Sequence, residues 1–482
     1  MLAEQGQRRY DDSLALAVTG PDQVEVWQWN AEQGQSMPKM LPPRSASAIV
    51  AARLASDAYR LAPEDFTVRR LYLGTLLEAA VLQAGLDQPL PEALGAAAEV
   101  ANQIGPDALD DVLQHSLDTG HVPAATAAAA ILGRSGLSEL AQSDSAAPRP
   151  LVAATRHADR RLRFAAVNAI LTINPQQPFA GASFVTDALR YFVATTGTRR
   201  ALAAAPRQDE ARRIGALLTE TGYQADVALD DRSLFQQAQS VPDYELLLVD
   251  SHLPGRPIEE LLQQLARDTT TGAIPVGVIA SPDDLPRAHQ AIKHHPRAMV
   301  FVRPVDPAGI TMQVQALAEQ LGPLVPTPAE RSEHARRSLE WLARLAAQPR
   351  SIYNLQPVDR VAERALYVPE LTGKAMEVLA NRPSAKGQLA LLELASRPTQ
   401  PLDLRQQAAA AFDRSVGRHG ILLTSPEILR QYERYNRSAT LDEGTQQVLG
   451  QLLDTLESRV AAPRTVPVSG PSPQESPAAA SR

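Results

Sequence analysis

The segment YELLLVDSHLPG, residues 244–255, decides how the middle of this 482-residue chain folds. Its apolar run has the length of a buried strand, and the Pro-Gly pair that follows is a turn signal. The strand predicted here covers 245–249 and leaves Asp250 at its carboxyl end. Because open α/β sheets bind ligands in the crevice beyond that end, Asp250 is the first candidate for a functional residue.

Four further strand-like runs, with amphipathic segments between them, surround this strand. Short strands that alternate with helices are typical of βαβ units, so we predict a doubly wound parallel sheet of the flavodoxin-like type over 198–322. The other four strands are expected at 200–205, 225–229, 275–280 and 298–302.

The ends of the last two strands carry a more specific pattern. IPVGVIA ends at Ala280 and is followed by Ser281, while FVRPVDP places Arg303 and Pro304 after the fifth strand. Together with Asp250 and with the segment ETGY at 220–223, these spacings resemble a response-regulator receiver domain. The resemblance covers 198–322.

In that family the third-strand aspartate accepts a phosphoryl group, an acidic pair after the first strand holds magnesium, and a hydroxyl residue and a lysine bind the phosphoryl oxygens. The resemblance therefore makes Asp250 the phosphoacceptor equivalent. It makes Ala280, Ser281, Arg303 and Pro304 the equivalents of the switch positions, with a cis peptide bond expected before Pro304.

The acidic pair is missing where the family has it. The corresponding positions are Ala205, Pro206 and Arg207, which carry no carboxylate. Phosphoryl transfer relies on a metal that bridges the transferred oxygens, so magnesium is not expected to bind well. Asp209 and Glu210 could replace the pair only if the first loop shifts register.

The other receiver positions also depart from the family. The hydroxyl position falls on Ala280, although Ser281 is adjacent, and the lysine position is Arg303, whose planar guanidinium differs from a compact ammonium. Arg207 or Arg303 could form a static ion pair with Asp250. We therefore expect a degenerate receiver whose crevice is closed.

Helical patterns dominate on both sides of this domain, over 45–197 and 331–460. In PLVAATRHADRRLRFAAVNAILTINP, residues 150–175, Asp159 is placed to cap a helix whose apolar side chains repeat every three or four positions. This segment resembles a HEAT repeat. DLRQQAAAAFDRSVGRHG, residues 403–420, repeats its pattern of charged residues followed by alanines. A plain helical bundle is the alternative, because it shares this periodicity.

The remaining segments are a front hairpin, a linker and a tail. Within 1–44, residues 24–41 alternate like a β-hairpin, and Trp27 and Trp29 are expected to pack against the helices. A Pro-rich linker is predicted at 322–330. The Pro-, Ser- and Ala-rich tail at 461–482 has too little apolar content to fold and is predicted to be disordered.

Composition excludes several classes of function. The chain has 47 basic and 54 acidic residues, a net charge of -7, so a general nucleic-acid or anionic-membrane binder is disfavoured. It has no cysteine, which excludes disulfides and thiolate metal sites. The 44% hydrophobic content with 4% aromatic residues favours Ala- and Leu-rich helices.

No apolar run is long enough for a membrane span, since the longest nearly apolar one covers only 122–132. A cytoplasmic location is expected, with an export signal conceivable only upstream of residue 1.

Other chemical motifs are weak. The histidine pairs 115/121 and 294/295 lack the spacing of a zinc site and are expected to be surface residues. The cluster Arg160, Arg161 and Arg163 is expected on a solvated repeat surface. The sequence contains no Gly-rich nucleotide loop and no Gly-x-Ser-x-Gly motif.

The sequence therefore predicts a non-enzymatic interaction scaffold in signalling, in which helical repeats flank a degenerate receiver. It would bind proteins, not nucleic acid or membrane, and would need no cofactor. The alternative is a phosphorelay response regulator in which Asp250 is phosphorylated with the help of Mg²⁺ at an atypical site.

Overall fold

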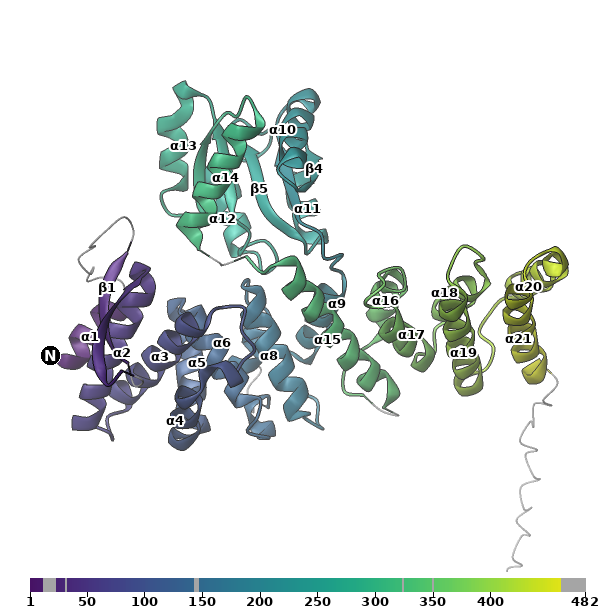
Figure 1. Ribbon diagram of the computed structural model, residues 1–482, viewed down its shortest axis with the longest axis horizontal. Coiled ribbons are helices and arrows are strands. Elements are labelled where there is room, and N and C mark those ends of the chain that lie inside the picture. Colours follow the sequence, from purple (N-terminus) through teal and green to yellow (C-terminus); the bar gives the residue numbers. More distant parts are fainter. Residues whose placement is uncertain (12–22, 31–32, 143–146, 323–324, 349–350, 461–482) are drawn as a thin grey trace, which may run out of the picture. The chain divides into compact units, whose positions relative to one another are not determined.

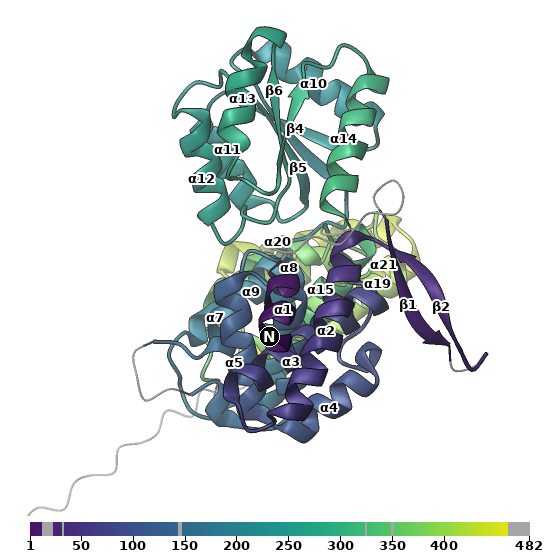
Figure 2. The same ribbon diagram turned by 90° about the vertical axis from the view of Figure 1, so that its left-hand side faces the viewer.

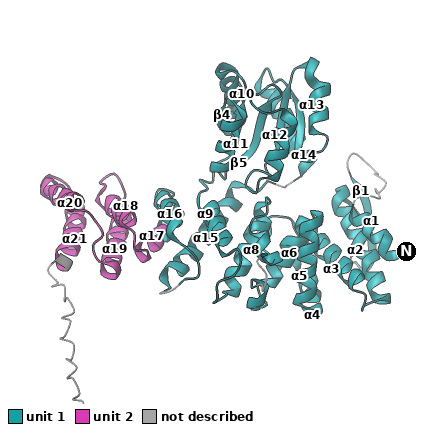
Figure 3. Ribbon diagram, turned by 180° about the vertical axis from the view of Figure 1, so that it is seen from behind, with its two compact units in different colours: residues 1–374 teal, residues 375–482 magenta. Residues whose placement is uncertain are grey.

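The computed structural model describes residues 1–11, 23–30, 33–142, 147–322, 325–348 and 351–460. These residues are mostly helical, with one five-stranded parallel sheet and one two-stranded sheet. The chain divides into two compact units, 1–374 and 375–482 (Figure 3). The predicted tail and part of the predicted linker lie outside the described residues.

The first unit begins with an array of helices that pack one against the next (Figure 1). The predominantly helical character predicted for this region is confirmed, and the arrangement is compatible with helical repeats. Its helices are α1 (Leu2–Tyr10), α2 (Pro43–Leu61), α3 (Phe66–Ala84), η1 (Glu92–Leu94), α4 (Ala96–Ile104), α5 (Pro106–Thr119), α6 (Val122–Leu132), η2 (Ser138–Leu140), α7 (Pro150–Ala154), α8 (Arg160–Ile173) and α9 (Ala182–Val193).

A side-chain cap sets the start of α8, and a glycine allows α6 to approach it closely. The predicted cap of α8 is confirmed, because the Asp159 carboxylate accepts hydrogen bonds from the amides of Arg161, at 3.0 Å, and Leu162, at 3.2 Å. At the end of α6, Gly133 lies so close to α8 that an added Cβ would sit 2.7 Å from the Cα of Ala169. Only glycine fits this contact without a shift of the helices.

The predicted hairpin is confirmed, with β1 at Val24–Asn30 paired antiparallel to β2 at Gln35–Leu41. Val24 and Val26 are buried against α2. The expectation that Trp27 and Trp29 also pack on the helices is wrong, because these side chains are 55% and 68% exposed. Strand alternation explains this, since both face away from the valines.

A five-stranded parallel sheet follows, as predicted, in the order β4-β3-β5-β6-β7. Its strands lie within two residues of the predicted bounds at every end. They are β3 (Arg200–Ala204), β4 (Gln224–Ala228), β5 (Tyr244–Asp250), β6 (Val276–Ala280) and β7 (Ala298–Val302).

Helices cover both faces of this sheet (Figure 2). Helices α10 (Gln208–Glu220) and α14 (Pro307–Leu321) share one core with the strands. Helices α11 (Asp231–Ser240), α12 (Ile258–Arg267) and α13 (Leu285–Ile292), the last preceded by η3 (Pro282–Asp284), form the other. The order of the strands changes direction between β3 and β5, because β4 lies on one side of β3 while β5, β6 and β7 follow on the other. Doubly wound sheets bind ligands at this point.

The helical array continues beyond this α/β domain. Helix α15 (Pro328–Ala347) packs against α9, so the helices before and after the domain are neighbours. The indole N–H of Trp341 in α15 donates a hydrogen bond to the Asn168 side chain in α8, at 3.1 Å. The α/β domain is therefore inserted between two helices that contact each other. The first unit ends with η4 (Gln356–Val358), α16 (Asp359–Ala365) and the start of α17 (Thr372–Asn381).

A buried ion pair joins the array to the domain. Arg331 of α15 is 2% exposed and lies 3.3 Å from the carboxylate of Asp243, just before β5, and 2.8 Å from the carboxylate of Glu245 in β5. Such a group is stable in a core only when its charge is paired. The array and the domain are thus held together by charge as well as by packing.

The arginines of α8 complete this junction. Arg160 donates a hydrogen bond to the Pro242 carbonyl at 3.2 Å, and Arg163 donates to the Thr269 carbonyl. Both are buried, so their predicted exposure on a solvated surface is wrong. The role of the two arginines is to bind backbone carbonyls of the α/β domain, which packs against them.

The second unit contains the rest of α17 and four further helices, α18 (Ala385–Ser396), α19 (Leu402–His419), α20 (Ser425–Arg437) and α21 (Glu443–Val460), with η5 at Ser438–Thr440. Within it, the Gln388 amide donates to the Gly420 carbonyl at 2.8 Å, and Arg434 pairs with Glu393 at 2.8 Å. Among the helices that the structure describes in both units, none is long and apolar enough to cross a membrane.

Candidate functional site

Asp250 is the last residue of β5, the strand that lies between β3 and β6. The apolar run that precedes it is buried on both faces of the sheet, so the carboxylate is delivered to the carboxyl edge with only 1% of the residue exposed. A carboxylate this deeply buried needs hydrogen-bond donors or a positive charge. The sequence placed Asp250 at this edge, and the structure does the same.

Arg303, just after β7, provides the positive charge. Its Nη2 lies 2.7 Å from Oδ2 of Asp250, and its other terminal nitrogen pairs with the carboxylate of Glu210 in the first turn of α10. The predicted ion pair between Arg303 and Asp250 is confirmed. Arg207, the other predicted candidate, pairs instead with Asp209 at the surface.

The second oxygen of Asp250 is held by the following turn. Oδ1 accepts a hydrogen bond from the backbone amide of His252 at 2.9 Å. Burial raises the pKa of Asp250 above its ordinary value, and this amide acts in the opposite direction. The guanidinium of Arg303, at hydrogen-bonding distance, also favours the charged form. Both oxygens of Asp250 are therefore occupied by donors from the protein itself.

The imidazole of His252 extends the site toward η3. Its Nε2 lies 3.6 Å from the Asp284 carboxylate, which also accepts a hydrogen bond from the Ser281 hydroxyl. Ser281 is thus engaged with Asp284, and Ala280 before it is fully buried. The two residues at the expected hydroxyl position present no hydroxyl group toward Asp250.

Pro304 follows Arg303, but the expected cis peptide bond before it is absent. The cis bond in the described part of the chain is Leu90–Pro91. The trans form is the ordinary preference of a peptide bond before proline. The backbone amide of Arg303 still donates to the Ala280 carbonyl at 3.1 Å, which fixes the start of the arginine beside the crevice.

The positions that the resemblance makes equivalent to a magnesium-binding acidic pair are Ala205, Pro206 and Arg207, and they carry no carboxylate. Ala205 is buried and donates its amide to the Ala228 carbonyl, while Pro206 and Arg207 lead into α10. Glu210 reaches the site instead, because its carboxylate pairs with Arg303. In the ranges that the structure describes, no group of three or more histidine and acidic side chains is arranged to hold a metal. The site brings together two carboxylates with an arginine between them.

A second polar cluster, which the sequence did not reveal, lies in the helical array. His121 Nδ1 is 3.2 Å from the buried Glu78 carboxylate, His121 Nε2 is 3.6 Å from Asp11, and the His121 ring stacks on Tyr10 at 3.6 Å. The expectation that His121 and His295 lie on the surface is therefore wrong, because both side chains are largely covered. The one sequence signal was Glu78 itself, an isolated charge in the apolar run of α3.

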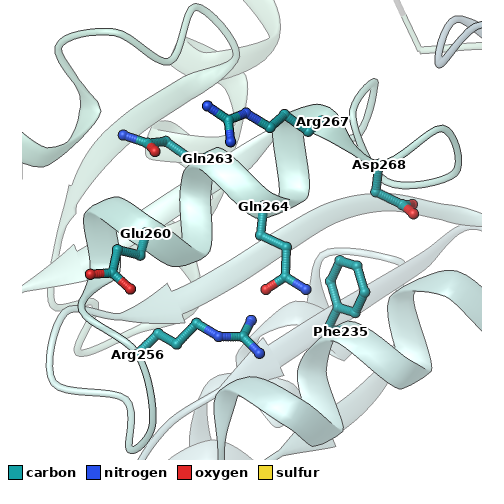
Figure 4. A pocket seen from close by; sticks show the side chains of 7 residues that line it. All are labelled: Phe235, Arg256, Glu260, Gln263, Gln264, Arg267 and Asp268. Carbon is teal, nitrogen blue, oxygen red and sulfur yellow. The ribbon is translucent and has the colours of Figure 1, made fainter.

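A shallow hollow of about 540 Å³ lies between α11 and α12 of the α/β domain (Figure 4). Phe235 projects from α11, and the Gln264 side chain on α12 lies beside it, while Arg256 comes from the preceding loop. Arg256 is 3.7 Å from the Asp231 carboxylate. The hollow does not include Asp250, and its polar groups form no arrangement for acid–base or nucleophilic chemistry.

Comparison with protein-family models gave no match, and neither did comparison with curated proteins.

Proposed function

We propose that this chain is a non-enzymatic protein-interaction scaffold in signalling, in which HEAT-like helical repeats carry a degenerate receiver domain of the flavodoxin-like type. The observation that supports this most strongly is the ion pair of Arg303 with both Asp250 and Glu210. In a working receiver a divalent cation would lie between such carboxylates. Here a side chain of the protein occupies that position.

A covalently attached guanidinium differs from a bound metal in ways that oppose phosphoryl transfer. It brings one positive charge instead of two, and it cannot ligate an incoming phosphoryl oxygen as Mg²⁺ does. Both oxygens of Asp250 are also engaged, one by Arg303 and one by the His252 amide. Asp250 would have to lose a partner before it could act as a nucleophile.

The helical array supports the interaction role. A cavity of about 850 Å³ in the array is lined by the loop after α3 together with α6, α8 and α15. A hollow that runs across successive helices is the kind of surface with which solenoids bind their partners. Two ion pairs lie within its lining, Arg161 with Glu330 at 2.6 Å and Arg134 with Glu92.

The buried junction defines what the α/β domain does in this scaffold. Arg331 of α15 pairs with Asp243 and Glu245, and the arginines of α8 contact the Pro242 and Thr269 carbonyls, so the domain is attached at several residues and not through its chain ends alone. We propose that it acts as a docking module that stays attached to the array. Its action as a docking module then requires no chemical change at Asp250.

Titration with Mg²⁺ and beryllofluoride, a mimic of a bound phosphoryl group, tests this proposal. A fluorescent probe attached after β7 reports binding in the wild type, Asp250→Asn and Arg303→Lys. We expect no saturable signal from the wild type. Arg303→Lys is the informative variant, because a shorter cation releases one carboxylate and should allow weak, Asp250-dependent binding. Saturable binding by the wild type that Asp250→Asn abolishes would overturn the scaffold proposal.

The second candidate is a phosphorelay response regulator with Asp250 as phosphoacceptor. One observation favours it, namely that Glu210 reaches the site although Ala205, Pro206 and Arg207 do not. In this candidate Mg²⁺ itself displaces Arg303, and Glu210 and Asp250 then face the metal ion. The titration separates the two candidates, since this one requires wild-type binding.

A further inference from the structure

The outward face of the β1–β2 hairpin carries an exposed apolar surface. Trp27 and Trp29 are 55% and 68% exposed, and Met40 on the neighbouring strand is 43% exposed. The register pairs Trp27 with Pro38 and Glu25 with Met40, so these five side chains share the face that looks away from α2. We call Glu25, Trp27, Trp29, Pro38 and Met40 the hairpin face.

We infer that the hairpin face binds an extended proline-rich peptide that carries a basic residue. The inference extends the proposed scaffold role by naming the chemistry of a partner, and it does not depend on Asp250.

The hairpin is held in place while its aromatic rings stay free. The guanidinium of Arg53 in α2 donates a hydrogen bond to the Trp27 carbonyl at 2.6 Å, and Val24 and Val26 anchor the other face. Single exposed apolar residues are ordinary, but a contiguous patch with two indoles is typical of an interaction site. The patch is therefore presented on a fixed support.

The size of the patch selects a short peptide over a second copy of the chain. A tryptophan can bury up to roughly 250 Å², so two half-exposed indoles and one methionine offer far less than the roughly 800 Å² that each partner contributes to a stable interface. A segment of a few residues can cover this surface. A dimer through this face alone would be too small to persist.

Strand addition fits the hairpin poorly. Pro38 in the middle of β2 has no N–H, and proline within a strand is a feature that discourages pairing along an edge. A polyproline II segment needs no such donor, because its backbone has no internal hydrogen bonds and its carbonyls are open to donors. The indole N–H groups of Trp27 and Trp29 have no hydrogen-bond partner among the described residues and can supply them.

Charge decides the flanking residue of the peptide. Glu25 lies two residues before Trp27 and therefore on the same face, where it is exposed and has no ion-pair partner in the described part of the chain. Lys39 lies on the opposite face of the hairpin by strand alternation. An arginine or lysine next to the proline segment would complement Glu25.

Titration of the full chain with synthetic peptides, followed by tryptophan fluorescence, tests this inference. The first probe is a run of prolines that ends in two arginines; the second has alanines in place of the prolines, and the third ends in two glutamates. We expect saturable binding of the first peptide and at least about tenfold weaker binding of the other two. Equal binding of the alanine peptide would overturn the inference.

Variants assign the binding to the face. Trp27→Ala and Trp29→Ala should each weaken binding by about tenfold or more, and Glu25→Gln should remove the preference for the arginine end over the glutamate end. Trp341→Phe is the control and should leave binding unchanged. Because the hairpin indoles are exposed, the thermal unfolding of the first two variants should match that of the wild type.

Other occupants give other results. If the same Trp variants instead abolish self-association in sedimentation, or binding to phosphatidylserine vesicles, while no peptide binds, the inference is wrong. A negative peptide titration would leave the Asp250 experiment untouched, so the two proposals fail separately.

Discussion

Arg303 and Asp250 are joined at 2.7 Å although 53 residues separate them in the chain, and Glu210 closes the arrangement from the other side of Arg303. Asp250 is almost fully buried, whereas the arginine side chain is 31% exposed. The buried partner depends on the exposed one, because a buried carboxylate without a counter-charge is costly. This asymmetry leads to the first prediction.

Arg303→Met should destabilise the protein by about 1–3 kcal/mol, because it leaves Asp250 buried without its cation and the partial exposure of Arg303 reduces the full cost of a broken buried pair. Asp250→Asn in that background should recover part of the loss. Urea unfolding of the two single variants and the double variant measures the coupling. Strictly additive changes would show that the two side chains do not interact.

Arg331 should contribute far more to stability than an exposed arginine of the same helix. Arg331→Met leaves the buried Asp243 carboxylate without its paired cation, while Glu245 keeps Arg199 at 2.9 Å, and we expect a loss of about 3–5 kcal/mol. Arg336, which pairs with Glu333 near the surface, is the matched control, and Arg336→Met should cost less than about 1 kcal/mol.

The same Arg331 variant also tests whether the array and the α/β domain unfold together. We expect the wild type to show one transition for both and the variant to show two, followed by probes in α15 and in β7. A single unchanged transition in Arg331→Met would contradict the role of this ion pair in the junction.

His334 makes stability depend on pH. Burial, and then Arg160 and Arg161, lower the pKa of His334 well below its ordinary value. The unfolded state therefore takes up a proton that the folded state refuses, and stability falls as the pH drops below about 6.5. In His334→Phe the loss between pH 7 and pH 5 should shrink, by at most about 2 kcal/mol.

The control for this pH effect is the exposed His289, and His289→Gln should retain the wild-type pH profile. Urea unfolding at both pH values provides the measurement. A profile of His334→Phe that matches the wild type would show that the imidazole is not held neutral by its surroundings.

The contact at Gly133 predicts a steric effect in the helical array. Gly133→Ala places a methyl group 2.7 Å from the Cα of Ala169, so α6 and α8 must move apart at a cost of about 1–3 kcal/mol. Gly373→Ala is the matched control, since nothing lies within 4 Å of the added carbon, and it should stabilise slightly. Thermal unfolding distinguishes the two, and equal changes would argue against close contact of the helices.

The sequence predicted most of the α/β domain because its signals are local. A run such as 245–249 is apolar at every position and is bounded by Pro and Gly, so length and punctuation identify it as a buried strand. Asp250 followed from the same reasoning. An ion pair of Asp250 with Arg207 or Arg303 was predicted as well, and the structure shows the pair with Arg303.

Features that depend on which surfaces meet were predicted less well. Arg160 and Arg163 belong to a charged segment that is typical of a solvated helix surface. They are buried because the α/β domain packs against them. Trp27 and Trp29 were expected to be covered because large aromatic residues usually are, but alternation in β1 gives the inner face to the valines. Glu210 was a weak candidate because its reach depends on the start of α10.

Phosphoryl transfer to Asp250 is the reaction that the Arg303 ion pair is proposed to prevent. The most direct measurement is the intact mass of the protein after incubation with Mg²⁺ and acetyl phosphate, a small phosphoryl donor, with Asp250→Asn treated in parallel. We predict that the mass of the wild type stays unchanged. The addition of one phosphoryl group to the wild type, absent from Asp250→Asn, would contradict the account.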